Sequence, residues 1–161
     1  MCAAYFTPMY TRGEASRIKQ EFWTTFGRYL TPVLSSDGTH VNWVNYHTHV
    51  KDVYFRMRAD NRSASIAISI EHTDATIREL YFEQFLELKT LLHGQLGEEW
   101  EWHRETVDES GRAVSRIARE IPNVSIFNKD DWPELITFFK ARIISLDKFW
   151  EDARYSFASL R

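Results

Sequence analysis

The chain has 161 residues, a formal net charge of −3 at pH 7, one cysteine and an aromatic content of 15%. This length predicts a single domain, residues 1–161 with a core over about 10–158, which is large enough to fold without disulfides. The mild acidity excludes a global basic excess that draws proteins to nucleic acid or acidic lipid, and no apolar run reaches the roughly 18 residues of a membrane span. Because Cys2 is alone and no secretory leader is present, we expect a cytoplasmic protein without a membrane partner.

The first predicted element is a helix that begins at Thr11. Thr11 and Glu14 have the spacing of a capping box, in which the hydroxyl and the carboxylate each satisfy a free amide of the first turn. Apolar residues then recur at helical spacing until Pro32, which marks the end of the helix. A short first strand is expected next, over residues 41–46, where apolar and polar residues alternate imperfectly.

The segment 51–72 predicts a β-hairpin with its turn at Asp60-Asn61-Arg62. The apolar positions are Val53, Phe55 and Met57 on one strand and Ala64, Ile66, Ile68 and Ile70 on the other. Since side chains alternate with a period of two, both apolar sets must share one face, and this fixes the parity of the pairing. Asp52 and Glu71 are therefore expected together at the end of the polar face.

The remaining elements are two helices and two strands. A helix capped by Thr73 or Asp74 is expected to end at Gly94, followed by strands over 100–105 and 113–121. A last helix with a wide apolar face is expected from about Trp132 to Phe157. The order α-β-β-β-α-β-β-α predicts an α+β fold, in which three helices pack on a mainly antiparallel five-stranded sheet.

Asp52 and Glu71 are the candidate catalytic and metal-binding residues of one hypothesis, a Mg²⁺-dependent nuclease. Mg²⁺ prefers oxygen ligands together with water and substrate phosphate, and two carboxylates on one face provide such ligands. The predicted order of elements is also that of the restriction-endonuclease-like fold, in which an Asp on the second strand precedes a Glu-x-Lys on the third. Here the third strand ends in Glu71-His72-Thr73, so the lysine is absent and Lys51 would have to replace it. The alternative interpretation is a salt-bridged, partly solvated sheet face.

Two weaker patterns lie outside the hairpin. His47 and His49 have the spacing of one strand face, with His40 nearby, and imidazoles bind Zn²⁺ or Ni²⁺; without a second histidine pair, an exposed loop is the better interpretation. A set of aromatic and basic residues has the character of a clamp for single-stranded nucleic acid. These residues are Trp100, Trp102, Arg104, Arg116 and Arg119. Glutamates adjoin both tryptophans and would repel phosphate, so core packing of the tryptophans is the better interpretation.

Several aromatic-rich motifs are spread over the chain. They are EASRIKQEFW at 14–23, Trp43, YFEQF at 81–85, GEEW at 97–100, SIFN at 125–128 and Phe149-Trp150. Taken together, from about Tyr10 to Arg161, they resemble an uncharacterised bacterial family, the domain of unknown function 4268. The resemblance implies a module that occurs alone or C-terminal to predicted nuclease-like domains in DNA-restriction contexts. It implies no activity for particular residues, and it favours a nucleic-acid-linked role by analogy only.

Three hypotheses about function remain open. The leading one is a noncatalytic binding module, associated with nucleic acid in a restriction or DNA-defence context and needing no cofactor. Its candidate binding residues are Lys51, Arg56, Arg58 and Arg62. The second is the nuclease, active or degenerate, with Mg²⁺ as its cofactor. The third is a structural domain that needs a protein partner.

A homodimer is also expected from the aromatic residues of the first and last helices. Trp23 and Phe149 lie off the centres of their apolar stripes. Aromatic surface left outside the core favours a symmetric contact between two copies.

Overall fold

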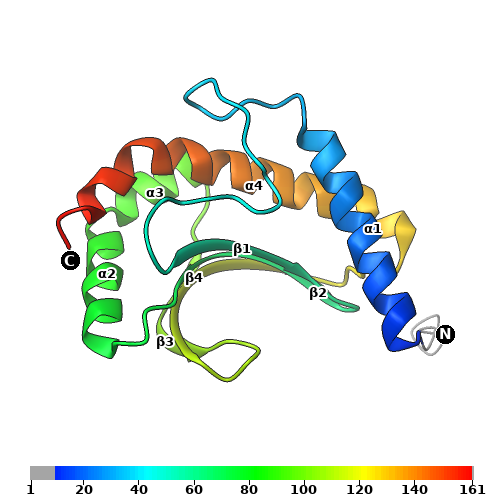
Figure 1. The fold of residues 1–161 in the computed structure, drawn as a ribbon, viewed down its shortest axis with the longest axis horizontal. Helices are drawn as coiled ribbons and strands as arrows, with labels where there is room; N and C mark the ends of the chain where they lie inside the picture. Colours follow the sequence, from blue (N-terminus) through cyan, green and yellow to red (C-terminus); the bar gives the residue numbers. More distant parts are fainter. Residues whose placement is uncertain (1–9, 161) are drawn as a thin grey trace.

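The computed structural model describes residues 10–160, so Cys2 and the expectation attached to it lie outside the described range. The helices are α1 Arg12–Leu30, α2 Ala75–Glu87, α3 Lys89–Leu96 and α4 Trp132–Ala153, with short 3₁₀-helices η2 Lys129–Asp131 and η3 Arg154–Phe157 flanking α4 (Figure 1). The strands are β1 Val53–Ala59, β2 Ser63–Ile70, β3 Glu101–Val107 and β4 Ala113–Pro122. Within residues 10–160, no helix is long and apolar enough to cross a membrane.

The strands form one antiparallel sheet in the order β1-β2-β4-β3. Val53 lies opposite Ile70 and Met57 opposite Ile66, so the predicted hairpin and the parity of its pairing are confirmed. The α+β class is confirmed as well. The predicted five-stranded sheet is wrong, because four strands make up the sheet of the described residues. The restriction-endonuclease-like fold is not confirmed.

Residues 41–46, predicted as the first strand, belong instead to the long connection between α1 and β1. The side-chain oxygen of Asn42 accepts hydrogen bonds from the backbone N–H groups of Val44 and Asn45, both at 3.1 Å, and this local turn bends the chain away from an extended path. The indole of Trp43 donates to the carbonyl of Val33, and the Tyr46 hydroxyl donates to Asp147 of α4 at 2.6 Å. Side chains, rather than strand pairing, therefore hold this segment against the core.

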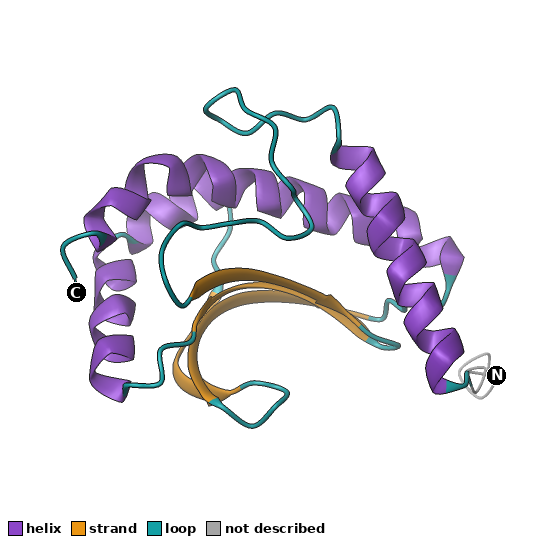
Figure 2. Cartoon of the chain, in the orientation of Figure 1, coloured by secondary structure: helices purple, strands orange, loops and turns teal. Residues whose placement is uncertain are grey.

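The sheet is strongly curved, and its two sides are different (Figure 2). Ile66, Ile68 and Ile70 of β2 point to the convex side, where all three are fully buried under the helices. α4 crosses this side with the predicted apolar face, and its Phe139 contacts Phe22 of α1 edge-on at 6.3 Å between ring centroids. Among residues 10–160, no helix lies on the concave side, toward which the β3–β4 hairpin curls.

The second predicted helix is interrupted at Leu88, whose φ of −98° and ψ of 8° leave the helical region and separate α2 from α3. α3 packs against α4, whereas α2 packs against β2 and β4, so the break lets the two helices follow different surfaces. The left-handed residue that ends α3 is Gly97, with a φ of 72°, and not Gly94 as predicted. The helix count is therefore four in the described chain rather than three.

The two aromatic residues behind the expected homodimer have different surroundings. Phe149 is 4% exposed and belongs to the core, so the prediction that it leaves free aromatic surface is wrong. Trp23 is half-buried and contacts Phe22 edge-on at 4.9 Å. The homodimer itself stays a prediction.

Candidate functional site

The concave face of the sheet is lined by charged side chains above a floor of small ones. Because β2 alternates, Ser65, Ala67 and Ser69 point to this side, opposite the isoleucines, and all three are buried. The arginines of the neighbouring strands and of the β3–β4 turn lie around a cavity of about 630 Å³ over this floor. Its charged residues are Arg56, Arg58, Glu71, Asp108, Glu109, Arg112, Arg116 and Glu120.

Glu71 is the buried carboxylate of the concave face that pairs with two arginines. Arg56 donates to it through Nε and Nη2, both at 2.9 Å, and Arg112 donates through Nη2 at 3.1 Å. Its side chain is only 6% exposed. Burial alone would raise the pKa of Glu71, but the hydrogen bonds and charge of Arg56, with the charge of Arg112, lower it below the usual value. Glu71 is therefore an ionised anchor with both oxygens engaged.

Arg116 of β4 is the cation of the concave face that has no acidic partner. No carboxylate oxygen of residues 10–160 lies within 4.0 Å of its guanidinium, and its one hydrogen bond runs from Nη2 to the Ser65 hydroxyl at 3.3 Å. Burial lowers the pKa of Arg116, and the nearby charge of Arg58 lowers it further. Arg58, by contrast, is paired with Glu109 at 3.0 Å. Glu120, Glu101 and Glu109 act on it only at longer range. Arg116 is thus a half-buried positive charge that forms no ion pair with the described residues.

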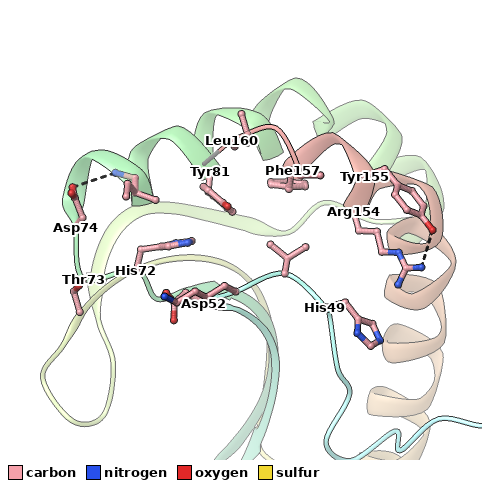
Figure 3. A pocket seen from close by; sticks show the side chains of 14 residues that line it. His49, Asp52, His72, Thr73, Asp74, Tyr81, Arg154, Tyr155, Phe157 and Leu160 are labelled. Atoms are coloured by element: carbon pink, nitrogen blue, oxygen red, sulfur yellow. Dashed lines mark hydrogen bonds between the residues drawn. The ribbon is translucent and has the colours of Figure 1, made fainter.

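Asp52 and Glu71, the two predicted nuclease carboxylates, are adjacent in the backbone but separate in their side chains. The Glu71 N–H donates to the Asp52 carbonyl at 2.7 Å, as the predicted parity requires. Asp52 has a left-handed φ of 62°, however, so its side chain leaves the strand alternation and lines a second cavity beside His72 (Figure 3). Within residues 10–160, no three His, Cys, Asp or Glu side chains are placed to hold a metal ion.

The predicted binding residues also divide between regions. Arg56 and Arg58 share the concave face. Lys51 lines the second cavity with Asp52, and Arg62 is exposed in the β1–β2 turn, where its N–H donates to Asp60 at 2.8 Å. The structure brings together two of these four cations and adds Arg116 to them.

The second cavity, here called the His72 cavity, has a volume of about 880 Å³. It lies between the start of β1, the start of α2 and the C-terminal segment after α4. Its apolar wall includes Tyr81 and Phe157, and the His72 ring lies 4.3 Å from the Tyr81 ring between centroids. Burial lowers the pKa of His72, while the charge of Asp52 opposes this change. The sequence placed His72 at the end of a strand but gave no sign that distant C-terminal residues would enclose it.

The histidine and tryptophan patterns have structural surroundings. His47 and His49 are exposed, and their rings lie 4.6 Å apart. Trp100 is 5% exposed and Trp102 packs against the core, as the core interpretation predicted. Arg104 pairs with two glutamates of α2, on the outside of β3, so it does not join Arg116.

The fold and the concave face define an α+β protein with one helix-covered and one open, charged side of its sheet. A model of the family described as domain of unknown function (DUF4268) matches residues 18–154, which is most of the chain. The chain belongs to this family. No curated protein and no solved structure matches it.

Proposed function

We propose that this chain is a noncatalytic binding module whose concave face binds the phosphate backbone of a single-stranded nucleic acid. The observation that carries the proposal is Arg116, a half-buried guanidinium with no carboxylate within 4.0 Å among residues 10–160. Guanidinium groups bind phosphate oxygens through paired, charge-assisted hydrogen bonds, so a phosphate would supply the direct ion pair that Arg116 does not form with the described residues. An unpaired, partly desolvated cation is unfavourable in the free protein, and an anionic ligand relieves it.

Arg58 and Tyr54 extend this surface along β1. Both side chains of the Arg58–Glu109 pair are exposed, at 49% and 65%, so the pair contributes little to stability. A phosphate can therefore replace the carboxylate. Tyr54 is 38% exposed, and the Arg56 guanidinium lies 4.1 Å from its ring centroid. Aromatic rings beside cations are a common platform for the bases of a single strand. Arg56 itself is held by Glu71 and acts as a positioning residue.

The test is the fluorescence anisotropy of a labelled single-stranded oligonucleotide, titrated with protein at low and raised salt. Arg116→Gln should lower the affinity about tenfold at low salt and reduce the slope of log K against log salt by roughly 0.7, the value for one lost phosphate contact. Arg119→Gln is the matched control, because Arg119 is an exposed arginine of the same strand that lies outside the concave cavity. It should leave the affinity unchanged.

Two outcomes would favour the other hypotheses. Absence of binding at low salt would remove the nucleic-acid role and leave the structural domain with a protein partner. Incubation with plasmid and Mg²⁺ tests the nuclease, with Asp52→Ala as its control. Nicking that disappears in this variant would overturn the noncatalytic part of the proposal.

A further inference from the structure

The His72 cavity contains apolar surface that the core does not cover and that the proposed function does not use. Its lining includes Ile77, which is 38% exposed, and Tyr155, which is 65% exposed. Tyr81 and Phe157 also line it, are almost fully buried and connect this surface to the core. A ligand that covers these side chains removes apolar surface from water, which is favourable.

Arg154 is a half-buried cation at one end of this cavity (Figure 3). No carboxylate oxygen of residues 10–160 lies within 4.0 Å of its guanidinium, and Asp37 acts on it only at longer range. The guanidinium donates from Nη2 to the Tyr155 hydroxyl at 2.9 Å and lies 4.9 Å from the centre of the Tyr155 ring. A guanidinium carries five N–H donors, so this one bond to a neutral group leaves donors for an anion.

The charges at the other end of the cavity offset one another. Lys51 and Asp52 are neighbours in the chain and both line the cavity, so together they add no net formal charge. Asp74 is engaged, because it caps α2 by accepting from the N–H of Thr76 at 2.8 Å, where the helix dipole offsets its charge. The cavity thus has a cationic end, an apolar middle and a mixed-charge end, and only the cationic end favours one sign of charge.

We propose that the His72 cavity binds an apolar monocarboxylate with an aliphatic chain. The carboxylate pairs with Arg154, and the chain lies along Phe157 and Tyr81 toward Ile77. A molecule with one negative charge followed by a hydrocarbon chain matches a cavity with a cation at one end and apolar side chains beyond it. The volume of about 880 Å³ is within the usual range for small-molecule sites. This site is separate from the concave face, so the proposal is independent of nucleic-acid binding.

The first test compares three ligands that share one chain and differ in the charge of the head group. Isothermal titration calorimetry with the full chain would use octanoate, 1-octanol and octylamine. Octanoate should bind at least about tenfold more tightly than either analogue, because only a carboxylate forms charge-assisted hydrogen bonds with a guanidinium.

The second test varies the chain at a constant head group. Octanoate should bind about tenfold more tightly than hexanoate, because two further CH₂ groups leave water for the cavity. Equal affinities for the two acids would show that the hydrocarbon chain does not enter the cavity.

Two variants assign the ends of the ligand. Arg154→Gln should lower the affinity for octanoate about tenfold and leave 1-octanol unchanged, with Arg28→Gln, an exposed arginine outside the cavity, as the matched control. Ile77→Ser should weaken octanoate and 1-octanol alike, by about fivefold. Leu80→Ser is its control, because Leu80 is 44% exposed on the same helix and does not line the cavity. Circular dichroism checks the fold of each variant.

Three results would overturn the proposal. They are the absence of octanoate binding at millimolar concentration, equal binding of octanoate and its two analogues, and octanoate binding that survives Arg154→Gln unchanged. Arg116→Gln on the concave face should leave octanoate binding unchanged, so failure here is distinguishable from failure of the nucleic-acid proposal.

Discussion

The two faces of β2 are both buried, but by different means. On the convex side Ile66, Ile68 and Ile70 lie under helices in an apolar core. On the concave side Ser65 and Ser69 are also buried, but arginines and carboxylates of neighbouring elements surround them. Burial on the first side comes from packing, whereas on the second it comes from charged side chains held by ion pairs. Both faces of β2 are buried, and the strand nevertheless separates an apolar core from a preorganised polar surface.

The largest effect expected from this comparison is that of Ile68→Ala. Ile68 is fully buried on the convex side, so its truncation should lower the free energy of unfolding by about 2–5 kcal/mol. Ser69→Ala, the neighbour on the concave side, removes the hydrogen bond from the Ser69 hydroxyl to Glu71 and should cost about 1 kcal/mol. Urea unfolding with an unchanged m-value measures both. Equal losses would mean that the concave side is part of the core.

Glu71→Gln tests the concave face itself, with an intermediate effect. At pH 7 the free energy of unfolding should fall by about 1–3 kcal/mol, because an amide cannot replace a carboxylate between two arginines. Urea unfolding at neutral pH measures this loss. Glu109→Gln, whose side chain is 65% exposed, is the control and should have little effect.

The pH dependence of stability gives Glu71 a second signature. Its pKa in the folded protein is lower than the ordinary value of 4.5, so its contribution is fully present above that value. The contribution is lost as the pH falls through the folded pKa, because the unfolded chain then binds the proton more readily. Acid titration of stability should therefore be steeper for the parent protein than for Glu71→Gln. Parallel curves would contradict the pairing.

Much of the sheet could be predicted from the sequence, because alternation with a period of two is local information. The hairpin of β1 and β2 and its parity followed from the alternating apolar residues of the two strands. The loop conformation of segment 41–46 could not be predicted. Trp43 packs into the core from a loop, and this long-range contact explains an apolar residue there without a strand. The break at Leu88 is likewise set by the different surfaces under α2 and α3.

The candidate site was less predictable than the fold. Glu71, Arg56 and Arg58 were expected on one face, and they are there. Asp52 was expected to join them, but a left-handed backbone turned its side chain away, and no pattern of residue types shows a positive φ at an aspartate. The enclosure of His72 by residues after α4 depends on tertiary packing over more than eighty residues of chain.

The smallest expected effect distinguishes the two kinds of ion pair on the concave face. A double-mutant cycle of Arg58→Ala and Glu109→Ala should give a coupling of about 0.2–1 kcal/mol at low salt, since both side chains are largely exposed. At about 1 M salt, where the Debye length is roughly 3 Å, this coupling should vanish. The coupling of Arg56 with Glu71 should persist there, because Glu71 is 6% exposed and is screened less. If the Arg58 coupling also persisted, Glu109 would hold its arginine too firmly for a phosphate to replace it, and the nucleic-acid contact would reduce to Arg116.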